Sequence, residues 1–325
     1  MKQSAGILQS ARHAAPLICN LENRRDSGDK IMVSIPSTFQ ERPGHHRLTT
    51  GPRSGAQATL CLHCSTGSSR QWRSLSTALG DSHRILAPDL LGYGDNPPWP
   101  RNRSLRLETE VQRLAPLLAS VAEPVDVVAH SFGAAVAVKL ALTYPDKVRS
   151  LCLYEPVLFG LLEQDVNAGT ALSEIHAASS RVGRALADGD ADAAARQFID
   201  FWSGKGTWTS MPESRRQSVT ARIGKVRADF AALLADDTTL PALAQLEAPV
   251  LCLSGGRSPE ATRRIANILA ATFPRAKIHR FEEAGHMGPL THPRQVNTRI
   301  EKFLKFPFTH SKEREAYTTL NAHAA

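Results

Sequence analysis

The chain has 325 residues, of which 42% are hydrophobic and 22% charged, so it can bury a large core and is neither a disordered protein nor a disulfide-stabilised miniprotein. No run approaches the roughly 20 apolar residues that a membrane-spanning helix needs. The net charge of +8 comes from scattered basic residues, and only 6% of residues are aromatic, which argues against a nucleic-acid-binding surface.

The two ends of the chain differ from its middle. Within residues 1–31, the apolar stretch Ala14–Cys19 is too short for a secretory signal and contains Pro16. We therefore expect a disordered extension there, or a start of translation at Met32. Residues 309–325 are polar and are expected to form a flexible tail.

Cysteine usage bears on location and on metal binding. The chain has 5 cysteines, an odd and sparse set that argues against a disulfide framework and favours a reducing, cytoplasmic location. Cys61 and Cys64 form a single CxxC with no second pair, so we expect no zinc site.

From about His46 to Phe306, short apolar runs alternate with helical patterns. The expected strands are Ala58–His63, His83–Leu90, Pro124–Ala129, Val148–Tyr154, Pro249–Leu253 and Ala276–Phe281. The helices expected among them are Arg70–Leu79, Leu105–Val121, Gly133–Thr143, Pro259–Thr272 and Pro293–Phe306. Continuous apolar strands alternating with helices predict an α/β fold with a mostly parallel, doubly wound sheet.

The alternation stops in the middle of the chain. There we expect an all-helical cap at 157–248, inserted between core segments 32–156 and 249–308. Its expected helices are Ala171–Ala187, Ala191–Trp202 and Arg215–Leu234. An insertion at the strand ends would cover the ligand crevice of the sheet. Its aromatic residues favour an apolar acyl or aromatic substrate, although some of them are expected to pack the cap itself: Phe159, Phe201, Trp202 and Trp208.

A strand followed by Ala-x-Ser-x-Gly and a helix of small residues carries the strongest chemical signal. A sharp strand-to-helix turn needs small residues two positions before and after its exposed residue, because the backbones crowd there. Ala129 and Gly133 meet this need, and Ser131 is the exposed residue. The N-terminus of the following helix favours an oxyanion, so Ser131 is a candidate nucleophile.

A serine nucleophile needs a base, and two histidines are candidates. His286 follows the last expected strand in a glycine-flanked loop, where a parallel sheet presents functional groups. His130 adjoins Ser131, but neighbouring side chains on a turn diverge, so His130 is expected to be a packed histidine. We therefore predict that His286 is the base.

Four features together resemble the α/β-hydrolase family across about His46 to Phe306. They are Leu62-His63 before a polar loop, the segment Pro88–Gly94 (PDLLGYG), the turn at Ser131, and Gly285-His286. The resemblance implies that Ser131 attacks an acyl carbon, that His286 acts as general base and then general acid, and that the insertion is a cap. It also implies oxyanion-hole N–H groups from Ser65 and Phe132, with Cys64 standing where glycine is usual.

The third member of the triad departs from the family pattern. The usual position of the acid is occupied by Ser258, which cannot stabilise an imidazolium as a carboxylate would. Some dehalogenase-like members carry the acid at the end of the strand after the nucleophile helix, where this chain has Glu155. We predict Glu155 as the acid, with Glu260 and Asp236 or Asp237 as alternatives.

A serine nucleophile predicts hydrolysis of a carboxylic ester, lactone or related acyl bond through an acyl-enzyme. Carbon–carbon bond hydrolysis of a diketone and perhydrolysis are close alternatives. A hydroxynitrile-lyase-like enzyme is also considered, but Met287 stands where such enzymes usually carry lysine. A non-catalytic binder of small molecules stays open because the acid is displaced. No metal or organic cofactor is implied, the expected partner is a small-molecule substrate, and the oligomeric state is left open.

Overall fold

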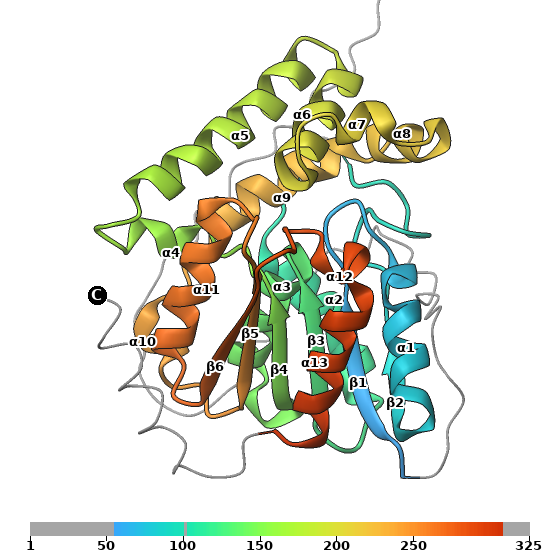
Figure 1. Cartoon of the computed structure of the whole chain (residues 1–325), viewed down its shortest axis with the longest axis vertical. Helices are drawn as coiled ribbons and strands as arrows, with labels where there is room; N and C mark the ends of the chain where they lie inside the picture. The colour runs from blue at the N-terminus through green and yellow to red at the C-terminus, as the bar shows by residue number, and fades with distance from the viewer. Residues whose placement is uncertain (1–54, 101–102, 308–325) are drawn as a thin grey trace, which may run out of the picture. The chain divides into compact units, whose positions relative to one another are not determined.

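A single parallel sheet organises the chain. The computed structural model describes residues 55–100 and 103–307, and the expected extension at 1–31 and tail at 309–325 lie outside them. Six strands pair in the order β2-β1-β3-β4-β5-β6, all parallel (Figure 1). They are β1 (Gln57–Leu62), β2 (His83–Leu86), β3 (Val125–His130), β4 (Val148–Tyr154), β5 (Val250–Gly255) and β6 (Ala276–Phe281). The predicted α/β class is confirmed.

Helices cover both faces of the sheet (Figure 1). On one face pack α1 (Arg73–Leu79), which follows the short helix η1 (Ser69–Trp72), and α13 (Pro293–Lys305), which follows α12 (Gly288–Thr291). The other face carries α2 (Leu107–Ala119), α3 (Phe132–Thr143) and α11 (Glu260–Thr272). Along β1, Leu60 and Leu62 belong to one buried cluster and Cys61 to the other. Burial on both faces explains why the strands are continuously apolar.

The sheet reverses its winding between β1 and β3. Strand β1 pairs with β2 on one side and with β3 on the other, and Leu62 lies in register with Ala129. The loop after β1 and the turn after β3 therefore leave the sheet side by side at its carboxyl edge. Ligands of open α/β sheets bind at such a switch point, so this edge is the first place to look for a site.

The helical insertion runs between β4 and β5. It contains α4 (Gly160–Glu163), α5 (Gly169–Ala187), α6 (Ala191–Ser203), α7 (Thr207–Ser210), α8 (Glu213–Thr220), α9 (Ile223–Leu234) and α10 (Leu240–Leu243). Helices α5 to α9 lie beyond the carboxyl edge of the sheet (Figure 1). Apolar residues of the insertion join the buried cluster of the α2–α3 face. The 157–248 boundaries of a separate cap domain therefore stay a prediction.

Two expected elements differ from the structure. Strand β2 ends at Leu86 rather than Leu90, because Pro88 has no N–H to donate to a neighbouring strand. The expected helix Arg215–Leu234 is two helices, α8 and α9. At the break, the Arg222 N–H bonds to the carbonyl of Val219, three residues back, and the Arg222 guanidinium donates to the carbonyl of Gly94 at 2.8 Å.

The segment Asp89–Gly94 forms a tight loop beyond β2. The Asp89 carboxylate accepts the N–H groups of Ser69 at 2.6 Å and Asp95 at 2.9 Å. Gly94 has φ +58°, and a Cβ there would lie 2.0 Å from the Asp89 carboxyl carbon. The glycine is therefore required by both its backbone conformation and the close carboxylate. Across the described residues, no helix has the length and apolar composition of a membrane span.

Candidate active site

Ser131 sits on a strained turn between β3 and α3. Its φ of +57° and ψ of −121° lie in a region that non-glycine residues rarely adopt, and its N–H donates to the Tyr154 carbonyl at 3.0 Å. A Cβ at Gly133 would lie 2.5 Å from the carbonyl oxygen of His63 and 2.6 Å from that of Leu62. The crowding that the sequence pattern predicts is therefore present, and the turn places Ser131 at the carboxyl edge of the sheet.

This crowding gives a stability prediction. We expect Gly133→Ala to lower the free energy of unfolding by about 1–3 kcal/mol, because the new methyl group overlaps backbone carbonyls that cannot swing away. The matched control is Gly183→Ala in α5, where nothing lies within 4 Å of the added carbon. That change should be neutral or stabilise by about 0.5–1 kcal/mol. Urea unfolding measures both, and equal effects would contradict the steric argument.

Three side chains form a continuous hydrogen-bonded chain at this edge. The His286 Nε2 atom lies 2.9 Å from Ser131 Oγ, and His286 Nδ1 lies 2.7 Å from Glu155 Oε2. Ser131 is 6% exposed, His286 3% and Glu155 0%. A carboxylate can only accept, so Nδ1 carries the proton and Nε2 is left to accept the Ser131 hydroxyl. This is the tautomer in which a histidine can take a proton from serine.

Glu155 is fixed in place from its other side. Its φ is +45°, and its Oε1 atom accepts the Gly255 N–H at 2.6 Å and the Ser258 hydroxyl at 2.5 Å. Ser258, which stands where the resemblance led us to expect the acid, thus orients Glu155 instead. Of the alternatives, Glu260 is exposed at the start of α11, and Asp236 bonds to Lys139, as does Asp237. Of these candidate acids, only Glu155 is hydrogen-bonded to His286 in the structure.

The loop that carries His286 is clamped by two buried side chains. His130 Nε2 donates to the His286 carbonyl at 2.8 Å, while its Nδ1 accepts from the Gln71 side-chain amide at 3.1 Å. Burial, and then the proximity of His286, lower the pKa of His130 well below its ordinary value. The Tyr154 hydroxyl donates to the Gly285 carbonyl at 2.8 Å. His130 is therefore a neutral, fully satisfied histidine, as predicted, and it also holds His286 in place.

Two backbone N–H groups, those of Ser65 and Phe132, are the predicted donors of the oxyanion hole. Phe132 is the first residue of α3, and Ser65 follows β1. Neither N–H has an acceptor within 55–100 and 103–307. Next to Ser65, His63 Nε2 accepts the Leu90 N–H at 2.9 Å, so its Nδ1 donates to the Cys64 carbonyl at 2.8 Å. Burial lowers the pKa of His63 to about 4, so it keeps this neutral form.

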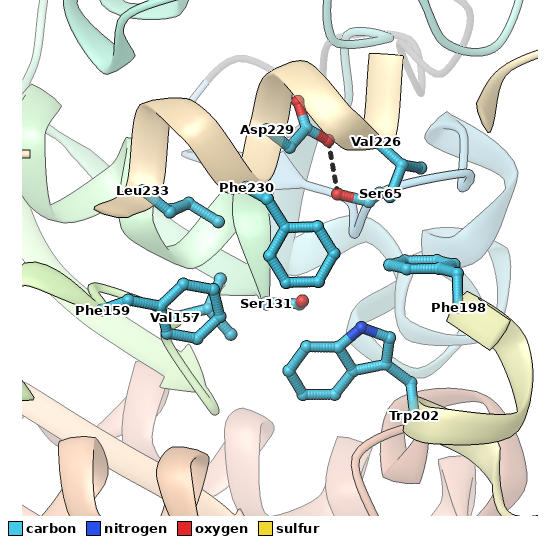
Figure 2. Close-up of a pocket in the computed structure, with 10 residues that line it drawn as sticks. All are labelled: Ser65, Ser131, Val157, Phe159, Phe198, Trp202, Val226, Asp229, Phe230 and Leu233. Atoms are coloured by element: carbon cyan, nitrogen blue, oxygen red, sulfur yellow. Dashed lines mark hydrogen bonds between the residues drawn. The ribbon is translucent and has the colours of Figure 1, made fainter. Parts of the chain in front are cut away.

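A pocket opens onto Ser131 (Figure 2). Its walls are almost entirely apolar and come largely from the insertion. Besides Ser65, Ser131 and Asp229, they are Val157, Phe159, Phe198, Trp202, Val226, Phe230 and Leu233. The Trp202 ring lies over the His286 imidazole, with ring centroids 4.2 Å apart. The insertion therefore both shapes the pocket and shields the base from water.

Comparisons with known proteins bear on the family and the fold of this chain. A model of the alpha/beta hydrolase family matches residues 59–299. The chain belongs to the α/β-hydrolase family. It is 26% identical to the biotin biosynthesis bifunctional protein BioHC of Teredinibacter turnerae, over 85% of this chain and 50% of that protein. It is 41% identical to the lipase LipV of Mycobacterium tuberculosis over 35% of this chain and 42% of that protein. The chain thus spans half or less of these two relatives. A thermophilic esterase from Thermogutta terrifontis has the same fold, with a TM-score of 0.62 at 20% identity over 78% of this chain and 91% of that one.

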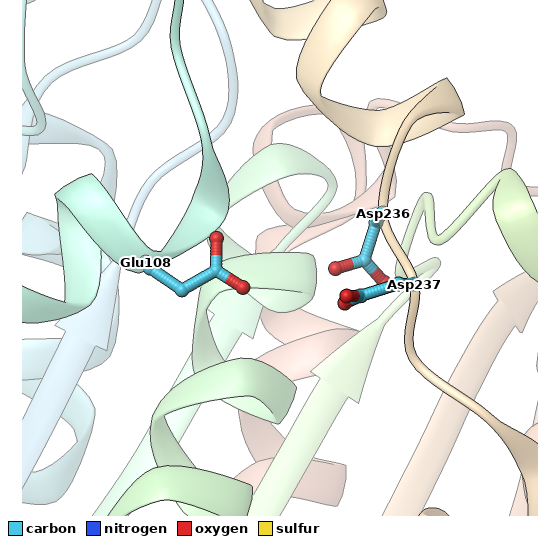
Figure 3. A group of neighbouring side chains, drawn as sticks. All are labelled: Glu108, Asp236 and Asp237. Atoms are coloured by element: carbon cyan, nitrogen blue, oxygen red, sulfur yellow. The ribbon is translucent and has the colours of Figure 1, made fainter. Parts of the chain in front are cut away.

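One group of carboxylates in this α/β hydrolase lies away from the pocket. Glu108, Asp236 and Asp237 offer oxygens within 4.8 Å of one another (Figure 3). Lys139 Nζ lies 3.0 Å from Glu108, 2.9 Å from Asp236 and 3.0 Å from Asp237. The single lysine ammonium therefore pairs with all three carboxylates, offsets one of their three negative charges, and joins α2 and α3 to the segment before α10.

Sequence reasoning missed two residues of this α/β hydrolase. Asp229 lines the pocket and, with Lys225, is buried within α9. A signal was present, because Lys225 and Asp229 form an oppositely charged pair four residues apart on a helix whose only other charged residue is Arg227. Nothing in the sequence says that Asp229 faces the pocket, since that depends on how α9 docks.

Proposed function

We propose that this chain is a serine hydrolase that cleaves a carboxylic ester or related acyl bond through Ser131, His286 and Glu155. The observation that carries the proposal is the hydrogen-bonded chain from Ser131 Oγ through the His286 ring to the buried Glu155 carboxylate. The opening of this chain onto an apolar pocket supports an acyl substrate.

In the first half of the proposed reaction, Ser131 Oγ attacks the acyl carbon while His286 Nε2 takes the hydroxyl proton. Glu155 stabilises the imidazolium that forms, and the N–H groups of Ser65 and Phe132 bind the developing oxyanion. When the tetrahedral intermediate collapses, the bond from the acyl carbon to the leaving oxygen breaks. His286 then protonates the departing alcohol, and the acyl group stays on Ser131.

In the second half, His286 takes a proton from a water molecule as that water attacks the acyl carbon. The Ser131 ester bond breaks, Oγ recovers a proton from His286, and the carboxylic acid leaves. Each half-reaction returns the imidazole to the neutral tautomer described above. Trp202, whose ring is tilted over this imidazole, covers one face of the base.

The pocket favours an uncharged acyl group. Of the ten residues that line it, Asp229 alone carries a charge, and none is lysine or arginine. A substrate carboxylate would lose its hydration beside an existing carboxylate with no cation lining the pocket to pair with it. The likeness to LipV, which is named as a lipase, supports the ester class.

This charge preference is a direct prediction. We expect p-nitrophenyl butyrate to be hydrolysed with a kcat/KM at least about 100-fold higher than p-nitrophenyl hydrogen succinate, because burying the carboxylate costs several kcal/mol. The matched control is the methyl ester of the succinate, which has the added length without the charge. Equal rates for the butyrate and the free succinate would contradict the assignment.

The proposed function is tested first with a fluorophosphonate probe, which traps activated serines without knowledge of the substrate. Peptide mass spectrometry should find one adduct on Ser131, and the adduct should disappear in His286→Ala. No adduct in a folded wild-type protein would contradict the proposal and favour a non-catalytic binding role.

A further inference from the structure

A buried polar network links the insertion to the loop after β1. Asp229 Oδ2 accepts the Ser65 hydroxyl at 2.6 Å (Figure 2) and also the hydroxyl of Tyr93. Asp229 Oδ1 accepts from Lys225 Nζ at 2.6 Å. Lys225 also bonds to Glu110 Oε1 at 3.2 Å, and Glu110 Oε2 accepts the Leu91 N–H at 3.1 Å. The network thus connects α9 to α2 and to the loops after β1 and β2.

All of these side chains except Ser65 are fully buried. Burial, followed by the nearby Asp229 charge, raises the pKa of Tyr93 well above its ordinary value, so its hydroxyl keeps its proton and donates. A buried ion pair contributes little net stability compared with apolar packing of the same volume. The pair Lys225–Asp229 therefore calls for an explanation other than stability, and Asp229 orients two hydroxyl groups, those of Ser65 and Tyr93.

The oxygens of Asp229 leave little capacity for a ligand. Oδ2 already accepts two hydroxyl groups, and Oδ1 accepts an ammonium group. A residue that recognised the substrate directly would keep an oxygen free toward the pocket. Asp229 instead directs its hydrogen bonds to the protein, which is the behaviour of a group that positions its neighbours.

A second contact from the insertion holds the same loop. Arg215 of α8 donates to the carbonyl of Thr66 at 3.2 Å. Thr66 has φ +59°, and a Cβ at Gly67 would lie 2.7 Å from the Cys64 carbonyl oxygen. A tight, strained loop of this kind keeps its conformation only where its surroundings over-determine it. Helices α8 and α9 supply that restraint on the residues that flank and include Ser65.

We propose that Asp229 is a positioning residue that holds the oxyanion-hole N–H of Ser65 in place, so that this half of the hole is formed only when α9 is docked on the core. The inference rests on the proposed function, because it concerns the same site. It predicts that the Ser65 hydroxyl matters for catalysis although it does not touch the reacting atoms.

The test is a double-mutant cycle on p-nitrophenyl butyrate hydrolysis. We expect Ser65→Ala to lower kcat about 10- to 100-fold and to change KM by less than about twofold. This loss of kcat is smaller than the roughly 10²- to 10³-fold loss that follows removal of a whole oxyanion-hole donor. Ser65→Ala leaves Asp229 with Tyr93 and Lys225 as partners, so this variant should fold even if Asp229→Asn does not. Asp229→Asn should lower kcat similarly in the wild type and by less than about twofold in the Ser65→Ala background.

A transition-state readout separates positioning from general damage. A trifluoromethyl ketone forms a tetrahedral oxyanion on serine, so its affinity should weaken in Ser65→Ala by the same factor as kcat. The matched control is Asp236→Asn, which removes the charge of another buried aspartate paired with a lysine, Lys139 at 2.9 Å. This control should lower stability without changing kcat or inhibitor affinity.

Three results would overturn the inference. An unchanged kcat in Ser65→Ala would show that the hydroxyl does not position the loop. Additive losses from Ser65→Ala and Asp229→Asn would show that Asp229 acts independently of Ser65. Absence of both turnover and a fluorophosphonate adduct in the wild type would overturn the proposed function, and this inference with it.

Discussion

Replacing Ser131 with alanine is expected to lower kcat for p-nitrophenyl butyrate by about 10⁶-fold, the size of loss seen when the nucleophile of a Ser–His–acid enzyme is removed. Within residues 55–100 and 103–307, no other side chain can take its place, because Ser131 alone among them is hydrogen-bonded to His286 Nε2. The fluorophosphonate adduct should disappear together with the activity. Binding of an apolar acyl group should persist, since the pocket walls are unchanged.

The matched control for this change is Ser150→Ala. Ser150 is also a buried serine at a strand, and its hydroxyl donates to Asp126 at 2.5 Å far from the carboxyl edge of the sheet. Its replacement should lower the free energy of unfolding by about 1 kcal/mol, as for a lost buried hydrogen bond, and leave kcat unchanged. Residual activity of Ser131→Ala above about 1% of wild type would contradict the role assigned to Ser131.

Features that depend on neighbours in the sequence were predicted well. The six strands, the turn at Ser131 and the need for Gly133 follow from short-range patterns: apolar runs, small residues at fixed spacing and the start of a helix. The position of His286 follows from its place after the last strand, because all carboxyl ends of a parallel sheet meet at one edge. Local rules and sheet topology thus determine where Ser131 and His286 lie.

Features that depend on docking were predicted less well. Glu155 was one of several candidate acids, and what distinguishes it is its contact with His286, 131 residues away along the chain. Asp229 contacts Ser65 across 164 residues. A sequence pattern predicts which face of a helix is apolar, but it does not predict which residues pack against that face. The break between α8 and α9 belongs to the same class, because it accompanies the contact of Arg222 with Gly94.

Replacing Glu155 with glutamine is expected to lower kcat about 10⁴-fold by imposing the wrong histidine tautomer. The Gly255 N–H and the Ser258 hydroxyl both donate to one side of the carboxylate, so the amide oxygen of the glutamine must take that side. The amide nitrogen then faces His286 Nδ1 and donates to it. The imidazole proton moves to Nε2, which can no longer accept the proton of Ser131. Glu260→Gln, at an exposed position, is the control and should keep full activity.

The same geometry predicts that the acid can be moved. In the variant Glu155→Ser with Ser258→Asp, the two residues exchange roles, and the carboxylate enters from the position where the family usually carries it. We expect the double variant to have a kcat at least about 10-fold higher than that of Glu155→Ser alone. The reason is that an imidazolium needs a nearby buried carboxylate, whichever position in the chain supplies it. Full activity in Glu155→Gln, or loss of activity in Glu260→Gln, would show instead that the catalytic acid lies elsewhere.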